Sequence, residues 1–218
     1  MVLFTQHWDV APGKQQAYSE FVMTHYNPTL EKIGIRLVGG YYVAIGAGPR
    51  IIAVGVTEGL RELDGALERD EYQNITSRLM SFVTNYQSRI LAPTGRVKLD
   101  KYTLQTGLWK LVQYWNIIPG MEVEYTEFVQ SDHLPTMEKL GVKVVNGWRL
   151  VVGAGPSIIS EAAAPTLVDI AKAIDTDEYR RVVRKLKTTY VTDYSSRVLA
   201  PTGRIDLPYF MKEMMKGF

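Results

Sequence analysis

The stretch Leu91-Ala-Pro-Thr-Gly-Arg96 occurs a second time in the chain, as Leu199-Ala-Pro-Thr-Gly-Arg204. Together with the seven residues before it, this stretch gives ten identities in thirteen positions at a shift of 108. Residues 8–55 and 115–162 give twenty identities in forty-eight positions at a shift of 107. A period of this length matches a whole small domain and is too long for a solenoid repeat. The sequence therefore predicts a tandem duplication of one folding unit.

The repeat divides the chain into three segments. We expect a first domain over residues 1–106, a second domain over residues 107–207, and a Met-rich C-terminal tail over residues 208–218. The connection between the copies is too short to act as a flexible tether, so the two domains are expected to lie against each other. If the tail is helical, its Met and Phe residues fall on one side. That side is expected to pack on the protein's own barrel, to contact another subunit or to cover the pocket as a lid.

Composition excludes several classes of function. The chain has 218 residues, 46% of them apolar and 22% charged, which is typical of a globular protein. Its net charge is +2 and Lys and Arg are scattered among Asp and Glu, so nucleic acid is not an expected partner. The absence of cysteine excludes disulfides, thiolate metal sites and cysteine nucleophiles. No run of about 18 apolar residues occurs, so no membrane helix is predicted and a cytoplasmic location is expected.

Hydrophobic periodicity predicts the same elements in each copy. In the first copy the expected strands cover residues 2–10, 35–45, 50–56 and 97–102, and the expected helices cover residues 14–32, 60–67 and 72–90. Gly46-Ala-Gly-Pro49 is expected to be a turn between two strands rather than a phosphate loop, because no helix follows it. This βαββαβ order predicts a four-stranded antiparallel sheet with helices on one face. One extra residue between Tyr179 and Thr192 predicts a π-bulge or a shifted helix end in the second copy.

Two kinds of motif occur in both copies. His25-Tyr-Asn-Pro28 corresponds to Asp132-His-Leu-Pro135, and the segment from Gly34 to Pro49 corresponds to the segment from Gly141 to Pro156. With the element order, these residues resemble the dimeric α+β barrel superfamily, nearest its NIPSNAP and EthD-like branches. The resemblance implies an α+β fold in which two tandem βαββαβ ferredoxin-like domains pack sheet to sheet as an intramolecular barrel.

The same resemblance leaves the activity open. Members of the superfamily include cofactor-free monooxygenases, polyketide cyclases, lactone isomerases and haem-handling enzymes, as well as proteins with no assigned role. A shared fold does not choose among these chemistries. Single-copy relatives need two chains to complete a barrel, so the fused chain is expected to be a monomeric barrel or a weak homodimer joined through its tail.

The first strand of each copy alternates between two faces. On one face the copies are similar, since Gln6 and Trp8 correspond to Gln113 and Trp115. On the other face they differ, at Thr5, His7 and Asp9 in the first copy and at Val112, Tyr114 and Asn116 in the second. The similar face is expected to pack under the helices. The divergent and more polar face is expected to line the space between the sheets, which is the candidate pocket.

The second strand diverges in the same way, because Tyr41 and Tyr42 of the first copy become Trp148 and Arg149 in the second. One half of the barrel is therefore expected to differ chemically from the other. An asymmetric pocket rich in aromatic residues suits a small ligand. The predicted substrate-binding residues are His7, Tyr41, Tyr42, Tyr114, Trp148 and Arg149. The expected partner is a small, largely apolar or aromatic molecule.

His133 is the predicted catalytic residue if the protein is an enzyme. It keeps the His-x-Pro spacing of the superfamily, whereas the equivalent residue of the first copy is Tyr26. An imidazole with an unperturbed pKa of about 6.5 can act as a general acid or base near neutrality. Trp148 and Arg149 would add an aromatic wall and a fixed cation, and the cation together with the imidazole can bind and protonate a developing oxyanion. The alternative is a structural histidine at a helix end, hydrogen-bonded to a backbone carbonyl.

The sequence leaves three functions open. The first is a small-molecule-binding barrel that acts as a cofactor-independent enzyme of the isomerase, cyclase or monooxygenase type. The second is a non-catalytic binding or scaffolding protein of NIPSNAP type, whose lumen is filled by side chains. The third is a haem-binding barrel, because one histidine and an aromatic pocket can hold haem. No cluster of residues has convincing metal-ligand spacing, so neither a metal nor an obligatory cofactor is expected.

Overall fold

The computed structural model describes residues 1–97 and 107–202 of the chain. The first half contains β1 (Val2–Val10), α1 (Gln15–Phe21), η1 (Val22–Tyr26), α2 (Asn27–Lys32), β2 (Arg36–Ile45), β3 (Ile51–Thr57), α3 (Leu60–Leu67), α4 (Asp70–Leu79) and β4 (Val83–Pro93). The second half contains β5 (Trp109–Ile117), α5 (Glu122–Phe128), η2 (Val129–His133), α6 (Leu134–Lys139), β6 (Lys143–Val152), β7 (Ile158–Ala164), α7 (Leu167–Ile174), α8 (Asp177–Lys185), η3 (Leu186–Tyr190) and β8 (Val191–Pro201). The η segments are π-helical turns, and apart from η3 the two halves have the same element order.

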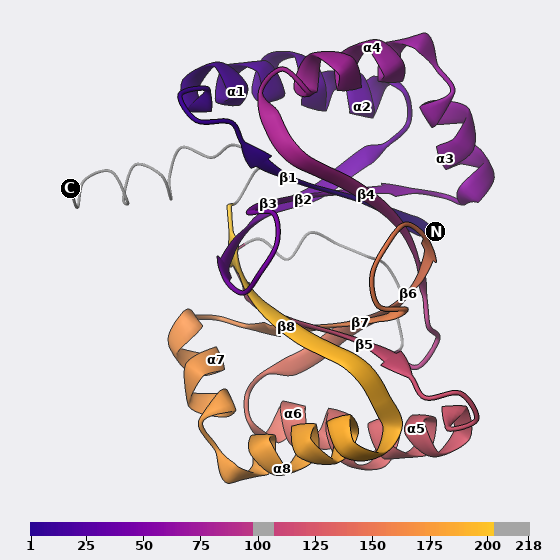
Figure 1. Cartoon of the computed structure of the whole chain (residues 1–218), viewed down its shortest axis with the longest axis vertical. Helices are drawn as coiled ribbons and strands as arrows, with labels where there is room; N and C mark the ends of the chain where they lie inside the picture. Colours follow the sequence, from indigo (N-terminus) through magenta and orange to yellow (C-terminus); the bar gives the residue numbers. More distant parts are fainter. Residues whose placement is uncertain (98–106, 203–218) are drawn as a thin grey trace.

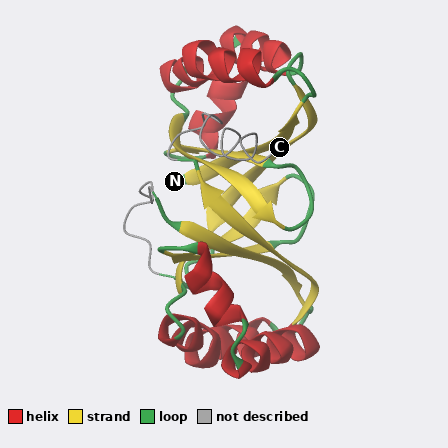
Figure 2. Cartoon of the chain, turned by 90° about the vertical axis from the view of Figure 1, so that its left-hand side faces the viewer, coloured by secondary structure: helices red, strands yellow, loops and turns green. Residues whose placement is uncertain are grey.

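The strands form one closed barrel in the order β1-β3-β2-β8-β5-β7-β6-β4. Each half contributes four neighbouring strands, and two antiparallel seams join the halves, one between β2 and β8 and one between β4 and β6. The helices of each half cover the outer face of its own sheet, at opposite ends of the molecule (Figure 1, Figure 2). The predicted α+β fold, with two ferredoxin-like sheets facing each other, is confirmed.

Alternation along the strands separates the core under the helices from the core inside the barrel. Trp8 of β1 packs with Tyr18 and Tyr26 beneath the first set of helices, and Trp115 of β5 packs with Tyr125 beneath the second set. The lumen has a separate apolar core made of Leu3, Val38, Tyr41, Val43, Ile52, Val54, Val56, Leu91, Val112, Tyr114, Trp148, Ile159 and Leu199. These positions match the faces predicted for the first strand of each copy.

A proline disturbs the first helical segment of each half. Pro28 and Pro135 lie in the first turn of α2 and α6. Proline has no amide hydrogen, and in a regular α-helix its ring collides with the carbonyl of the residue four positions earlier. The chain widens into the π-helical turns η1 and η2 directly before these prolines and then continues as α-helix. Tyr26 and His133, the last residues of the two π-helical turns, are buried against the sheets.

The predicted helix over residues 72–90 is wrong beyond Leu79. α4 ends there, and the following segment forms β4, which pairs with β1. Asn85 in β4 has a φ of 55°, and the register between the two strands shifts beside it, so β4 carries a bulge. The bulge breaks the two-residue alternation of a regular strand. The apolar residues of β4 therefore resemble a continuation of the helical spacing.

The extra residue of the second half lies where the sequence predicts it. α8 is followed by the π-helical turn η3 directly before β8, whereas α4 has no such turn before β4. A π-helical turn accommodates one additional residue. The strand pairing after it is unchanged, because Arg197 pairs with Val112 as Arg89 pairs with Thr5 in the first half.

Some predictions fall outside the described residues. The expected strand over residues 97–102 lies outside them beyond Val97, and the Met-rich tail over residues 208–218 lies entirely outside them. The domain boundaries at residues 106 and 207 also lie there and stay predictions. Within the described ranges, no helix has the length and apolar character needed to cross a bilayer.

The packing of the seam between β4 and β6 can be tested with one glycine. Gly153 has a φ of +119°, and a Cβ added to it would lie 2.9 Å from the backbone oxygen of Ser88. Gly153→Ala should lower the free energy of unfolding by about 1–2 kcal/mol through backbone strain and by a further 1–3 kcal/mol, roughly, through overpacking. Gly120→Ala is the control, because Gly120 has a φ of +87° with nothing within 4 Å of the added Cβ. Urea unfolding that gives equal losses for the two variants would contradict a tightly packed seam.

Candidate functional site

Four polar side chains come together in the lumen. His7 on β1 and Arg89 on β4 belong to the first half, and Tyr114 on β5 and Arg197 on β8 belong to the second. Strand register places both arginines on the lumen face, and the charges of both act on His7 and on Tyr114. His7 and Tyr114 occupy equivalent positions in the two copies, as do the two arginines. The cluster therefore lies across the boundary between the halves and needs both of them.

His7 is held as a neutral imidazole. Its side chain is 4% exposed, and its Nε2 lies 3.2 Å from Oγ1 of Thr5. Burial, followed by the charges of Arg89 and Arg197, lowers the pKa of His7 to about 3. Nδ1 of His7 has no hydrogen-bond partner among the residues that the structure describes. At neutral pH the ring is therefore uncharged and keeps one nitrogen available for a further hydrogen bond.

Arg89 and Arg197 carry charges that no acid in the described part of the chain neutralises. Neither forms an ion pair there, and Nε of Arg89 and Nη1 of Arg197 have no hydrogen-bond partner within residues 1–97 and 107–202. Burial lowers the pKa of Arg89, which is 8% exposed, and the charge of Arg197 acts in the same direction. The guanidinium carbon of Arg197 lies 5.3 Å from the ring centroid of Tyr114. Burying cations without a counter-charge is unfavourable for folding.

Each of these arginines is covered by a glycine loop from the opposite half. The loop between β2 and β3 lies against Arg197, and the loop between β6 and β7 lies against Arg89. A Cβ added at Gly48 would lie 2.6 Å from Nη2 of Arg197, and one added at Gly155 would lie 3.2 Å from Nη2 of Arg89. Both glycines have positive φ angles, +98° and +120°. Glycine is therefore required at these positions for both the backbone conformation and the close approach of a guanidinium.

The glycine loops are fixed by side chains whose types are exchanged between the copies. Asp9 accepts hydrogen bonds from the backbone N–H of Arg50 at 2.8 Å and from Nδ2 of Asn85 at 2.9 Å. In the second half, Oδ1 of Asn116 accepts a 2.7 Å hydrogen bond from the backbone N–H of Ser157, and Nδ2 of Asn116 donates a 2.8 Å hydrogen bond to Asp193. Asp9 and Asn116, which were expected in the pocket, thus hold the ends of the loops.

A second polar network lies in the lumen of the second half. Nζ of Lys110, a residue that is 1% exposed, lies 3.5 Å from Oε2 of Glu161, which also accepts a 3.0 Å hydrogen bond from Asn146. The same Nζ is 4.4 Å from the ring centroid of Tyr41. The first half has aliphatic residues at the positions of Lys110 and Glu161. The lumen is therefore asymmetric, and the charge of this lysine is matched by an acid.

The structure brings together part of the predicted ligand site. His7, Tyr41, Tyr114 and Trp148 all lie on the lumen face of their strands and are at most 5% exposed. Burial raises the pKa values of Tyr41 and Tyr114, so both hydroxyls remain protonated at neutral pH. These side chains supply aromatic surface and polar donors within one space.

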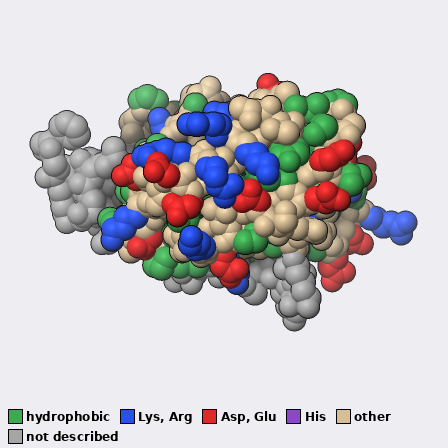
Figure 3. Space-filling view, turned by 90° about the horizontal axis from the view of Figure 1, so that it is seen from below, with side chains coloured by type: hydrophobic (Ala, Val, Ile, Leu, Met, Phe, Trp, Pro, Cys, Tyr) green, Lys and Arg blue, Asp and Glu red, His purple; other side chains and the backbone are tan. Residues whose placement is uncertain are grey.

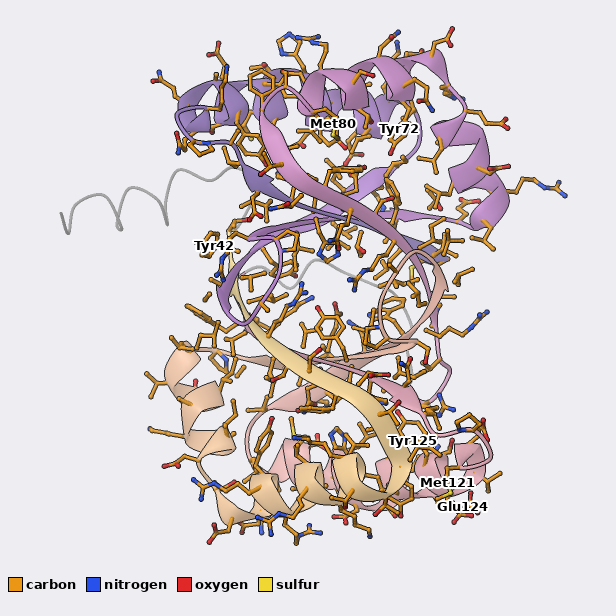
Figure 4. All side chains as sticks on the ribbon, in the orientation of Figure 1. Tyr42, Tyr72, Met80, Met121, Glu124 and Tyr125 are labelled. Atoms are coloured by element: carbon orange, nitrogen blue, oxygen red, sulfur yellow. The ribbon has the colours of Figure 1, made fainter. Side chains whose placement is uncertain are left out.

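The other two predicted ligand residues lie outside this space. Tyr42 packs against the core under the first set of helices and lies at the edge of the first sheet (Figure 4). Arg149 is exposed on the opposite face of β6 from Trp148. Adjacent residues of a strand point to opposite faces, so Tyr42 and Arg149 cannot share the lumen with their neighbours Tyr41 and Trp148.

His133 lies behind the second sheet, among the side chains under the helices. It is 1% exposed, and its ring centroid lies 6.2 Å from that of Trp115 and 6.3 Å from that of Phe128. Trp115 and Trp148 are on opposite faces of the sheet, so the sheet separates His133 from the lumen. Burial lowers the pKa of His133 to about 4. The structure therefore does not bring together His133, Trp148 and Arg149, and a catalytic role for His133 stays a prediction.

The two lumen arginines and the Lys110–Glu161 pair are functional candidates that are absent from the site predicted from the sequence. Arg89 and Arg197 lie in segments predicted as helix, where lumen and outer faces cannot be assigned. Their identity in both copies, next to the most similar stretch of the chain, is the signal that points to them. Lys110 lies two residues before Val112 and four residues before Tyr114, which are both lumen positions. Alternation along the strand therefore predicts that Lys110 faces the lumen as well.

Haem ligation does not fit either of the two buried histidines. The ring of His133 is packed against Trp115 and Phe128 behind the sheet. His7 lies beside two unmatched guanidinium groups, which disfavour a further cationic centre at its nitrogen. The described residues also contain no group of three or more acidic or histidine side chains that could hold a metal ion.

Comparison with known proteins shows the fold and leaves the activity open. No protein-family model matches the chain, and no curated protein matches it by sequence. A protein from Lactobacillus acidophilus, provisionally assigned as a monooxygenase, is similar over 94% of this chain and 98% of its own, with a TM-score of 0.59 and 12% identity. An anthrone oxidase-like protein is similar over 92% and 90%, with a TM-score of 0.60 and 9% identity. A NIPSNAP family protein from Agrobacterium tumefaciens covers 43% of this chain and 92% of its own, with a TM-score of 0.37 and 23% identity.

The class defined by these likenesses is the dimeric α+β barrel fold, as the resemblance of the sequence implies. At identities this low, a likeness in structure says nothing of the substrate.

The two buried histidines predict a specific dependence of stability on pH. Below about pH 6.5 the unfolded chain binds a proton at each histidine, whereas folded His133 and His7 remain neutral down to about pH 4 and about pH 3. The unfolded state binds more protons in this window, so the free energy of unfolding should fall as the pH falls, by about 1.4 kcal/mol per pH unit for each histidine.

Urea unfolding between pH 7 and pH 4.5 measures this slope. His133→Gln should reduce this slope by the contribution of one histidine, and His7→Gln should do the same. A slope that is the same in the unmodified chain and in both variants would contradict the buried neutral state of the two histidines.

Proposed function

We propose that the chain is a small-molecule-binding α+β barrel whose ligand site is the lumen around His7 and Tyr114. The observation that supports this most is a set of buried polar atoms without partners among the described residues, namely Nδ1 of His7, Nε of Arg89 and Nη1 of Arg197. Buried polar atoms in folded proteins nearly always have a hydrogen-bond partner. Three that lack one in the same space favour a bound molecule that supplies it.

The walls of the lumen suit the body of an apolar or aromatic ligand. Tyr41 and Trp148 provide aromatic surface. Aliphatic surface comes from Val43 on β2, Ile52 on β3 and Ile159 on β7. Binding sites for small molecules are usually of this kind, apolar with a few polar groups that fix orientation. The cluster at His7 and Tyr114 would fix orientation here.

Cofactor-independent catalysis is the second candidate, and the arginines favour it. Isomerases, cyclases and monooxygenases of this type share a step in which negative charge develops on a substrate oxygen. Two guanidinium groups beside Tyr114 in a buried space would stabilise that charge more strongly than the same groups in water. His7, with its pKa lowered to about 3, would serve such a reaction as a neutral hydrogen-bonding group rather than as an acid.

A non-catalytic scaffold of NIPSNAP type is favoured by a different observation. The lumen contains a continuous apolar core, so much of its space is occupied by side chains (Figure 4). A filled barrel would still present its outer helices to a protein partner. Ligand binding and scaffolding therefore differ in one measurable property, which is whether the lumen accepts a small molecule.

We also propose that one chain forms the complete barrel, with the two fused copies meeting near residue 106. Both seams, β2 with β8 and β4 with β6, form within the chain, which supports a monomeric working unit. A weak homodimer through residues 208–218 would leave this barrel unchanged.

The proposed site is tested by isothermal titration calorimetry with 2-naphthamide, a neutral aromatic probe. Saturable binding of one probe per chain is expected. Trp148→Phe should weaken it about tenfold, or about 1.4 kcal/mol, because Trp148 is fully buried on the lumen face. Trp115→Phe is the matched control, since Trp115 is equally buried but lies behind the sheet. An equal loss in both variants, or no saturable binding of either this probe or an anionic analogue of the same shape, would leave the scaffold as the better account.

A further inference from the structure

Charged side chains on the outer helices lie next to side chains of opposite charge, whereas two arginines in the lumen do not within the part of the chain that the structure describes. Figure 3 shows Lys and Arg next to Asp and Glu on the helical face at the lower end of the molecule. There Nη2 of Arg181 lies 2.8 Å from Oδ1 of Asp132. Inside the barrel, Lys110 has a carboxylate at 3.5 Å, whereas the two lumen arginines have none within the described ranges. The unmatched positive charge is therefore concentrated at one place in the lumen.

The groups without partners at this place are alike in hydrogen-bonding character. Nε of Arg89 and Nη1 of Arg197 are N–H donors at any physiological pH. If the hydroxyl of Thr5 donates to Nε2 of His7, then Nδ1 of His7 is also an N–H donor. A ligand group that accepts several hydrogen bonds and donates none would satisfy all three donors and neutralise charge at the same time.

On the basis of the proposed lumen site, we infer that the ligand carries an oxyanion, a carboxylate or a phosphate, which is bound between Arg89 and Arg197 with His7 as an uncharged third donor. Carboxylate and phosphate oxygens are the acceptors that guanidinium groups bind most strongly. The apolar walls described above would hold the remainder of the molecule. The substrate class is therefore an anionic molecule with an apolar or aromatic body.

The glycine loops position the two cations for this task. Each loop comes from one half and limits the place of the guanidinium that belongs to the other half. Guanidinium groups held in place lose less side-chain freedom when a ligand binds, which favours affinity. The loops are anchored in turn by Asp9 and Asn116, so the position of each arginine depends on residues from both halves.

The inference is tested by comparing 2-naphthoate with 2-naphthamide, which have nearly the same shape and differ in charge. Calorimetry on the full chain should show 2-naphthoate binding at least tenfold more tightly. Arg89→Gln and Arg197→Gln should each remove most of this preference, and the corresponding Lys variants should keep part of it. Arg149→Gln is the control, because Arg149 is exposed outside the barrel, and it should leave the preference unchanged.

A second pair of variants tests the loops without changing any charge. Gly48→Ala places a Cβ against Nη2 of Arg197 and should displace that guanidinium, lowering the affinity for 2-naphthoate severalfold and that for 2-naphthamide little. Gly13→Ala is the control, since Gly13 has a φ of +76° and open space around the added Cβ. Its affinity for both probes should match that of the unmodified chain.

The possible outcomes separate this inference from the proposed function. Equal affinity for 2-naphthoate and 2-naphthamide, or a preference that persists in both Gln variants, would overturn the oxyanion site while leaving a lumen ligand site in place. Failure of both probes to bind would contradict the lumen site itself. With 2-naphthyl phosphate as a third probe, tighter binding than 2-naphthoate assigns the site to phosphates and weaker binding assigns it to carboxylates.

Discussion

The pairing of strand edges between the two halves is the interaction on which the rest of the structure depends. A four-stranded sheet covered by helices on one face leaves two open edges and one bare face. Pairing β2 with β8 and β4 with β6 satisfies both edges of both sheets and closes the barrel. The bare faces become the wall of the lumen. The same seams bring the glycine loop of each half over an arginine of the other, so the polar cluster forms only when the halves are joined.

The lumen combines an apolar core with polar groups that folding alone does not explain. The Lys110–Glu161 pair is matched in charge and hydrogen-bonded to Asn146, so its burial is compensated. Arg89 and Arg197 have no such compensation among the described residues, and a methionine of similar volume would fold there more easily. Strain and unmatched charge are commonly retained where they serve binding, at the expense of stability. A ligand that binds only the folded chain would restore stability by an amount that rises with the logarithm of its concentration above Kd.

The sequence predicted the architecture better than the site, for identifiable physical reasons. The internal repeat and the alternation of Trp8 with His7 were sufficient to assign the faces of the first strand. The segment containing Arg89 could not be assigned, because the bulge at Asn85 interrupts the alternation and imitates helical spacing. The His-x-Pro spacing predicts a catalytic role for His133, but the π-helical turn before Pro135 places this side chain behind the sheet. Which face a helix-end residue occupies depends on tertiary packing, which one sequence does not show.

The proposed oxyanion site implies that Arg89 is buried for a ligand and not for the stability of the fold. The most direct measurement is the free energy of unfolding of Arg89→Met in the absence of any ligand, at pH 7, by urea titration. Removing a buried charge that has no partner should raise this free energy, by about 1 kcal/mol or more. A decrease of about 1 kcal/mol or more would show that Arg89 has a stabilising partner, and would contradict the claim.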